Sequence, residues 1–331
     1  MKRNAWSSAA AIAGAVIGAG FASGREIVVF FSRYGLHGWW LAGLSVAVMT
    51  GLCRLCLTEA RRTGSRCWCA LFEDKPRWSK HLAQMCVTAL LAVMGGSMLS
   101  ASGHMIALMW PNEWAYSLGA AGTMAAAWFL GRGSMKPMSM LSGMLTGCLL
   151  GVMGLALLME PSSAVQMAPR APGIHAAVRV LAYAGMNMTL AMGVVCRCAQ
   201  SASKTTTLCF GALMELLTGA AHALYSRHPE WMQEAFPLVR LLSGMGRTGF
   251  WLSAVLLYLS ILTSLTAVLC ALRCAFEQYG SSKWTAIGSL ALPLLLSLIG
   301  FEGIVDHVYA PVGLVCLALV FGPLILYRRQ T

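Results

Sequence analysis

The feature that most constrains this chain is an apolar stretch near its start, residues 10–31, whose centre is neither uniformly apolar nor helix-favouring. It is long enough to cross a lipid bilayer, which requires about 20 residues. Three closely spaced glycines interrupt it: Gly18, Gly20 and Gly24. Each glycine weakens a helix interior by about 1 kcal/mol relative to alanine. The sequence from Ser23 to Glu26 also has the pattern of a capping box, which marks a helix start. We therefore predict two half-helices separated by an unwound turn.

A break inside the membrane has chemical consequences. It leaves amides and carbonyls without helical partners, and these groups must face protein or a watery cavity. Amides that begin the second half-helix attract an anion, and carbonyls that end the first half attract a cation. The same glycines also suit a groove for close packing against another helix. The sequence leaves both interpretations open.

Composition places the chain among integral membrane proteins. Of its 331 residues, 58% are hydrophobic and 11% are charged, a balance that a soluble domain does not show. We predict an all-α fold with about ten transmembrane helices in a single membrane domain, residues 1–331. A cleavable signal peptide is not expected, because a charged pair and not a small-residue cleavage site follows the first stretch. The hydrophobic stretches are residues 5–33, 38–58, 82–110, 114–131, 137–159, 175–197, 205–225, 248–273, 284–301 and 303–327.

Positive charge is distributed unevenly between the predicted loops. The formal net charge is +12, with 24 Lys and Arg residues. If the N-terminus is cytoplasmic and the spans alternate, most of these residues fall on the cytoplasmic side, in agreement with the positive-inside rule. The charge thus sets orientation and favours contact with the lipid bilayer; it does not predict nucleic-acid binding. We expect a multi-pass protein of the cytoplasmic (inner) membrane with both termini in the cytoplasm.

The sixth predicted span resembles the first in having a glycine and polar groups at its centre. Tyr183, Gly185 and Asn187 lie mid-span, where a polar side chain must find a partner. Because the two interrupted helices are five spans apart and each half has an odd number of spans, the halves enter the membrane from opposite sides. We therefore predict an inverted repeat, residues 1–160 and 174–331, with broken helices one and six around a binding site at the membrane midplane.

Two further spans carry polar groups that suit ion coupling. Thr263 and Ser264 lie on one face of the eighth span with Ser260, and hydroxyl oxygens suit a small hard cation. Such side chains also commonly bond back to their own helix. Glu215 lies near the centre of the seventh span, where an unpaired charge costs at least ~2.5 kcal/mol. It is a candidate for proton coupling, or a carboxyl that is protonated or hydrogen-bonded between helices.

The remaining polar features predict no catalytic site. Cysteines occur in close pairs, but no second CxxC motif and no histidine cluster completes a set of zinc ligands. We interpret His104 as a hydrogen-bonded interfacial residue. The basic segment 59–80 predicts an amphipathic helix on the inner membrane surface, or else a docking site for a partner. Residues 228–246 are too polar to span and form either an outer lid or a surface loop.

Three stretches together carry a resemblance to a known family. Residues 14–31, 183–187 and 304–313 resemble the YkvI-like membrane proteins, distant relatives of the amino acid–polyamine–organocation transporters. The resemblance extends almost from end to end, and the first stretch is the most specific. It implies the LeuT-type fold, a five-plus-five inverted repeat with spans one and six unwound around the substrate.

The resemblance also implies roles for individual residues. The substrate-binding positions are Gly18, Ala19, Gly20 and Phe21, whose amides hold a substrate carboxylate, and Tyr183, Gly185 and Asn187 in the facing break. The sodium-binding positions are Thr263 and Ser264, completed by the carbonyls of Ala13 and Val16. Some proton-coupled relatives place a lysine from span five in the cation position, but residues 137–159 contain no lysine. This absence favours Na⁺.

From these observations we expect a secondary active transporter that moves an amino acid or a similar small zwitterion, coupled to Na⁺ and without a further cofactor. The first alternative is proton-coupled transport through Glu215. The second is a non-transporting membrane sensor or scaffold on the same fold. An enzyme is not expected, because no nucleophile and base occur at a plausible spacing.

Overall fold

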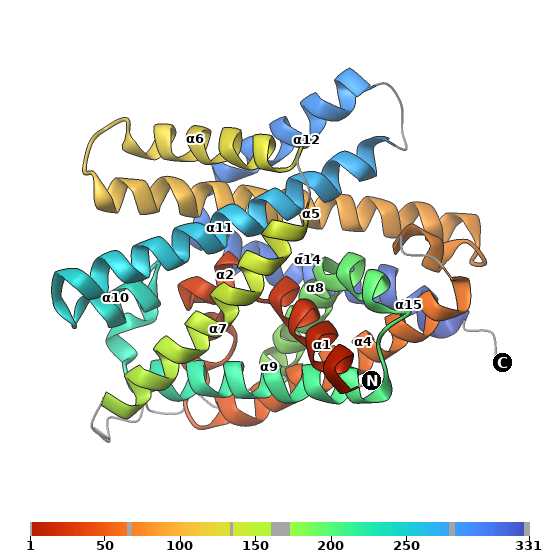
Figure 1. The fold of residues 1–331 in the computed structure, drawn as a ribbon, viewed down its shortest axis with the longest axis horizontal. Coiled ribbons are helices and arrows are strands. Elements are labelled where there is room, and N and C mark those ends of the chain that lie inside the picture. Colours follow the sequence, from red (N-terminus) through yellow and green to blue (C-terminus); the bar gives the residue numbers. More distant parts are fainter. Residues whose placement is uncertain (1, 65–67, 133–134, 160–172, 278–281, 328–331) are drawn as a thin grey trace.

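The computed structural model describes residues 2–64, 68–132, 135–159, 173–277 and 282–327 (Figure 1). Within these ranges every regular element is a helix, which confirms the all-helical prediction. The α-helices are α1 (Lys2–Val16), α2 (Ala19–Ser23), α3 (Arg25–Phe30), α4 (His37–Thr63), α5 (Arg77–Met109), α6 (Ala115–Leu130), α7 (Met135–Met159), α8 (Ile174–Cys198), α9 (Lys204–Tyr225), α10 (Pro237–Ser243), α11 (Gly246–Glu277), α12 (Ser282–Ser297), α13 (Phe301–Gly303), α14 (Tyr309–Cys316) and α15 (Gly322–Leu326). Short turns of 3-10 helix are η1 (Ser32–Tyr34), η2 (Trp68–Phe72) and η3 (Pro229–Gln233), and the π-helical turns η4 (Ile304–Val308) and η5 (Leu317–Phe321) join α13, α14 and α15.

Each of the predicted hydrophobic stretches coincides with helical structure. In the described part of the chain, 6 helices are individually long and apolar enough to cross a membrane. Those spans are His37–Thr63, Arg77–Met109, Ile174–Cys198, Lys204–Tyr225, Gly246–Arg273 and Phe301–Leu326. The chain is therefore a multi-pass membrane protein. The division into inverted halves, residues 1–160 and 174–331, stays a prediction.

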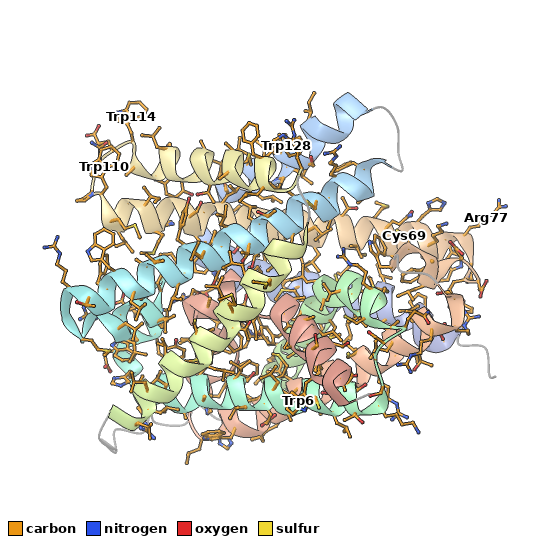
Figure 2. All side chains as sticks on the ribbon, in the orientation of Figure 1. Trp6, Cys69, Arg77, Trp110, Trp114 and Trp128 are labelled. Carbon is orange, nitrogen blue, oxygen red and sulfur yellow. The ribbon has the colours of Figure 1, made fainter. Side chains whose placement is uncertain are left out.

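Most of the long helices run along the long axis of the molecule, which has two chemically different ends (Figures 1 and 2). We call the end with η2, Arg77 and the chain termini the terminal end, and the end with Trp110, Trp114 and α10 the distal end. Tryptophan is enriched where a membrane meets water, and Trp110 and Trp114 are both exposed. The ends therefore correspond to the two faces of a membrane, and their assignment to cytoplasm and exterior stays a prediction.

The predicted break in helix one is confirmed. The first helix α1 ends at Val16 and α2 begins at Ala19, with Gly18 in an extended conformation at φ −88° and ψ −168°. A second interruption follows at Gly24, whose φ of +84° places it in the left-handed region that favours glycine. The first hydrophobic stretch is thus divided into three short helices.

The capping box predicted from Ser23 to Glu26 is wrong, although a helix does begin there. The N-cap of α3 is Gly24, which has no side chain to cap with. The Ser23 hydroxyl instead donates to the Gly20 carbonyl at 2.7 Å and accepts from the Arg25 amide at 3.1 Å. These bonds bend the chain between α2 and α3 and leave Glu26 available for another role.

The predicted break in helix six is also wrong, because α8 is continuous from Ile174 to Cys198. Two of its mid-span polar side chains bond within the helix. Asn187 donates through Nδ2 to the Tyr183 carbonyl at 3.0 Å, and Thr189 donates to the Gly185 carbonyl at 2.8 Å. These bonds follow the i to i−4 pattern of side chains that fold back onto their own helix.

The glycine in α8 serves close packing, which was the alternative interpretation of such residues. A Cβ atom added at Gly185 would lie 2.9 Å from the Gly313 carbonyl oxygen, and one added at Gly313 would lie 2.7 Å from the Ala182 carbonyl carbon. The backbones of α8 and α14 therefore approach directly, as in other contacts between small residues of membrane helices.

The basic segment 59–80 does not form an amphipathic surface helix, so this prediction is wrong. Residues 65–67 lie outside the described ranges, and the described residues on either side of them pack at the terminal end. Leu71 and Phe72 of η2 are buried against the protein. Lys75 donates to the Tyr327 carbonyl at 2.6 Å, and Glu59 forms an ion pair with Arg62 at 3.0 Å. Internal partners thus replace the lipid surface.

The contact between α8 and α14 yields a stability prediction. Gly313→Ala should lower the free energy of unfolding by about 1–3 kcal/mol through overpacking, because its methyl group meets backbone atoms of Ala182 that cannot move independently. The matched control is Gly51→Ala in α4, where a Cβ has no neighbour within 4 Å; it should be neutral or stabilising by up to about 1 kcal/mol. Thermal unfolding of both variants in detergent makes the measurement, and equal melting temperatures contradict the prediction.

Candidate functional site

A cavity of about 420 Å³ lies beside the break in helix one. Its walls come from α1, α5, α8 and α11, with single contributions from other elements. It extends from Gly18 and Glu26 at its deep end to Trp68, Arg197 and Cys198 at the terminal end. This volume suits a small molecule. The cavity therefore joins the centre of the molecule to one end of it.

Most of the cavity wall is apolar, and the polar groups gather near the helix break. Methionines and small aliphatic residues of α1, α5 and α11 form much of the surface. The polar side chains of the inner part are Glu26, Asn187, Thr189, Thr263 and Ser264. Hydrophobic walls with a few convergent polar groups are typical of ligand sites.

The structure brings together some of the predicted site residues and not others. Gly18, Val16, Asn187, Thr263 and Ser264 border the cavity, and the Ser264 hydroxyl lies 3.5 Å from the position that a Cβ of Gly18 would take. The predicted residues that do not border it are Ala13, Gly20, Phe21, Tyr183 and Gly185. The side chain of Ala19 lies outside the described part of the chain.

The backbone at the break agrees only in part with the predicted ion and carboxylate contacts. The carbonyls of Ala13 and Val16 accept hydrogen bonds from the amides of Ile17 and Gly18, at 2.8 and 2.9 Å. Each carbonyl retains a second lone pair for another partner. Helix starts leave their first amides unpaired, and within the described residues the amide of Gly20 has no backbone partner.

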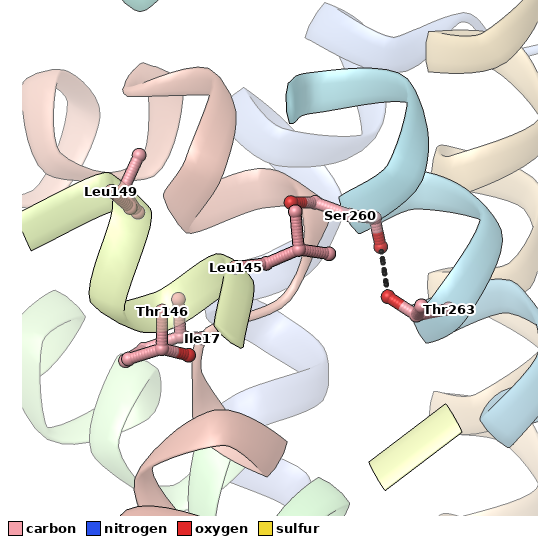
Figure 3. A pocket seen from close by; sticks show the side chains of 6 residues that line it. All are labelled: Ile17, Leu145, Thr146, Leu149, Ser260 and Thr263. Atoms are coloured by element: carbon pink, nitrogen blue, oxygen red, sulfur yellow. Dashed lines mark hydrogen bonds between the residues drawn. The ribbon is translucent and has the colours of Figure 1, made fainter. Parts of the chain in front are cut away.

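Thr263 borders a second, much smaller cavity of about 10 Å³, which is comparable with the space for one water molecule. Figure 3 shows its lining: Ile17 follows α1, Leu145, Thr146 and Leu149 come from α7, and Ser260 and Thr263 come from α11. The Thr263 hydroxyl donates to the carbonyls of Leu259 and Ser260 at 3.0 and 3.1 Å. It therefore bonds back to its own helix, and its oxygen can still accept a cation.

Glu26 is the functional candidate that the sequence analysis missed. Its side chain is only 2% exposed, and it borders the deep end of the large cavity. A Cβ added at Gly20 would lie 2.5 Å from the carboxyl carbon of Glu26, so the carboxyl group folds back over α2. An acidic residue inside a predicted span is itself a functional signal. In the sequence, however, Glu26 was already explained as part of a capping box, so it was not considered as a site residue.

On the distal side of Glu26, an ion pair links α3 to η4. Arg25 donates to both carboxylate oxygens of Asp306, at 2.7 and 3.3 Å. The same guanidinium donates to the carbonyls of Met232 and Glu234, each at 3.0 Å. These carbonyls belong to the predicted lid segment 228–246, which thus contacts α3. Side-chain exposure is 6% for Arg25 and 24% for Asp306, so the pair is partly shielded from solvent.

Aromatic side chains fill the space beside this ion pair. The Tyr183 ring packs against Phe30 at 4.8 Å between centroids and meets Phe31 edge-on at 5.4 Å. Arg179 lies over the Phe30 ring at 5.6 Å and donates to the Asp306 carbonyl at 3.3 Å. Tyr183 thus packs among aromatic rings and does not border the cavity, and its role in substrate binding stays a prediction.

Two other predicted residues lie away from the cavity. Glu215 is on the exposed face of α9, with a carboxylate oxygen 4.0 Å from the Cβ position of Gly43 in α4. Its role in proton coupling stays a prediction without support from its position. His104 hydrogen-bonds with the Ser100 carbonyl at 3.1 Å and contacts Tyr116 edge-on, as expected for a structural residue.

Comparisons with known proteins show the fold and not the family. No protein-family model matches the sequence, and no curated protein sequence matches it. The structure is similar to a manganese transporter from Eremococcus coleocola in complex with an aromatic bis-isothiourea-substituted compound, with a TM-score of 0.55 and 15% identity over 97% of this chain and 78% of that one. A histidine-to-alanine mutant of the Eremococcus coleocola transporter gives a TM-score of 0.52 and 14% identity, over 96% and 77%. The chain therefore has a membrane-transporter fold, and its relation to the YkvI-like proteins stays a prediction.

The second interruption of helix one yields a prediction about its packing. Gly24→Ala should be more destabilising than Gly64→Ala, although both glycines have positive φ and both variants incur about 1–2 kcal/mol of backbone strain. At Gly24 the added methyl group also lies 2.6 Å from the buried Tyr225 hydroxyl, whereas Gly64 has open space. Overpacking should add about 1–3 kcal/mol at Gly24. Thermal unfolding in detergent measures the difference, and equal losses would contradict it.

Proposed function

We propose that the protein is a secondary transporter that moves a small zwitterionic solute, such as an amino acid, across the cytoplasmic membrane by alternating access. The observation that carries the proposal is the cavity beside the broken helix one, which extends to the terminal end. We propose that the Arg25–Asp306 pair, which lies beyond the deep end of the cavity, forms the distal closure. A polar site that reaches one membrane face and is blocked from the other is the arrangement that alternating access requires.

The orientation follows from charge. The terminal end carries the basic segment 59–80, and positive residues favour the cytoplasmic side. The structure then corresponds to an inward-facing state with both termini in the cytoplasm. Opening to the exterior requires that Arg25 release Asp306 and the carbonyls of Met232 and Glu234.

A zwitterion fits the cavity better than the manganese named for the structural neighbours. Carboxylates, carbonyls and water are the ligands that Mn²⁺ prefers, yet Glu26 is the only carboxylate that lines the large cavity in the described part of the chain. Within those residues no three His, Cys, Asp or Glu side chains gather in a metal-binding group. The solute that we propose therefore differs from the manganese named for the structural neighbours, although the folds are similar.

Sodium is the coupling ion that we propose. Thr263 and Ser264 lie beside the end of α1, and the carbonyls of Ala13 and Val16 each keep a lone pair after their backbone bonds. Hydroxyl and carbonyl oxygens are hard ligands that suit a small cation. Proton coupling through Glu215 is less well supported, because that carboxylate is exposed and remote from the cavity wall.

Uptake into proteoliposomes tests the transport function. Under an inward Na⁺ gradient we expect at least one of the common amino acids to accumulate, and replacement of Na⁺ by K⁺ to abolish accumulation. Thr263→Val should raise the Na⁺ concentration for half-maximal uptake by about tenfold, the equivalent of about 1.4 kcal/mol. Thr266→Val is the control, since Thr266 is on the same helix, is buried and lines neither cavity. Uptake driven by a pH gradient without Na⁺, and lost in Glu215→Gln, would establish the proton-coupled alternative, whereas solute binding without flux would indicate a sensor.

Thiol labelling tests alternating access independently of the solute. In a variant that retains Cys198 as its only cysteine, a small maleimide should label this residue through the open terminal end. Asp306→Asn weakens the distal closure, so it should shift the population outward and slow labelling in proportion to the loss of the inward-facing state. Glu234→Gln is the control, because its side chain is exposed and its partner Arg240 is 4.0 Å away. An unchanged or faster rate in Asp306→Asn argues against the ion pair as the closure.

A further inference from the structure

Glu26 is a buried acid that borders the cavity and has no cationic partner in the described part of the chain. Its side chain is 2% exposed, and no ion pair includes it there. The adjacent Arg25 is fully engaged with Asp306 and with the carbonyls of Met232 and Glu234. The guanidinium of Arg25 therefore belongs to the distal closure, whereas Glu26 borders the cavity.

The protein surroundings of Glu26 are neutral. The nearby phenols are Tyr183, whose hydroxyl interacts with the Glu26 carboxyl, and Tyr309, whose hydroxyl donates to Ser97 at 2.9 Å. Phenols stabilise a carboxylate less than a counter-ion does. An ionised carboxylate removed from water costs several kcal/mol unless it is paired. The open side of this carboxylate is the cavity, so the occupant of the cavity is its available counter-ion.

The location of Glu26 separates it from the proposed sodium site. The carboxyl group lies over Gly20, on the α2 side of the break, whereas Thr263 and Ser264 lie on the α1 side, next to Gly18. A cation held by the hydroxyls of α11 therefore leaves Glu26 to a different positive charge. In a zwitterion that charge is the amino group.

We infer that the Glu26 carboxylate binds the protonated amino group of the transported solute, so that the site selects solutes that carry a primary amine. This inference rests on the proposed transport function and adds the substrate class that Glu26 dictates. A solute with the same carbon skeleton and no amine leaves Glu26 buried and unpaired. Unpaired buried polar groups are an effective means of rejecting an analogue.

The experiment uses the purified full chain and sets of three matched probes. Each common amino acid is compared with its decarboxylated amine and with its deaminated carboxylic acid, by thermal shift and by competition for uptake. We expect the amino acids and amines that fit the cavity to raise the melting temperature, as ligands of the native state do. The deaminated acids should bind about ten- to hundredfold more weakly, which is the effect of losing a hydrogen bond to a charged group.

Two variants, one isosteric and one that is shorter by a methylene group but keeps the charge, assign this selectivity to Glu26. Glu26→Gln removes the charge and should abolish the preference for amine-bearing probes, whereas Glu26→Asp keeps the charge and should retain part of it. Glu113→Gln is the control, since it removes the charge of an exposed carboxylate outside the cavity and should leave every affinity within about twofold. If Glu26→Gln does not fold, the comparison of amines with deaminated acids on the unaltered protein still decides the question.

The possible failures are distinguishable. Equal binding of amine-bearing and deaminated probes, or unchanged affinities in Glu26→Gln, overturns the inference while measured uptake still supports transport. Loss of proton movement in Glu26→Gln with unchanged solute affinity also overturns it, because the carboxyl then carries a proton and does not bind the solute. If no probe binds and none is taken up, the proposed function fails as well.

Discussion

The structure depends on how the chain satisfies backbone groups in the middle of a membrane. An uninterrupted helix pairs all of its interior amides and carbonyls, and a break exposes groups that hydrocarbon cannot satisfy. The break at Gly18 is therefore placed where α11 supplies the Ser264 hydroxyl and where a cavity reaches the backbone. Ser264 and Glu26 are the polar side chains of the cavity wall that lie closest to this interruption and to α2. In the long helices, the backbone groups pair within the helix and the apolar side chains pack against neighbouring helices.

Two adjacent residues of α3 have different partners. Arg25 holds the distal closure through Asp306 and the lid carbonyls, and Glu26 borders the cavity on the other side of the helix. Consecutive residues of a helix are about 100° apart around its axis, so one short helix presents a charge of each sign to a different compartment. Any displacement of α3 moves both groups together. The left-handed turn at Gly24 separates this short helix from α2.

The sequence predicted the helical membrane fold and the break in helix one, and it was wrong about helix six for a physical reason. Glycine with nearby polar residues signals either an unwound turn or a close helix contact, and the local pattern is the same in both. At Gly185 the outcome was decided by Gly313, which is far away in the sequence and becomes a neighbour only through folding. Glu26 was obscured in a similar way, because the pattern from Ser23 to Glu26 matched a capping box. The direction of the Glu26 side chain depends on the backbone at Gly24, where φ is +84°. The spacing of residues in the sequence does not reveal that angle.

Cargo is set by the side chains at the break rather than by the architecture around it. The structural neighbours are manganese transporters at 15% and 14% identity, and a divalent metal requires several oxygen ligands at close range. A single buried carboxyl group beside hydroxyls and a side-chain amide offers at most one negative charge, with neutral partners. Such a set balances one ammonium group and leaves a divalent ion undercompensated in a medium of low dielectric constant. Similarity in fold at this level of identity therefore carries no cargo assignment, and the acidic side chain on the described wall of this cavity is Glu26.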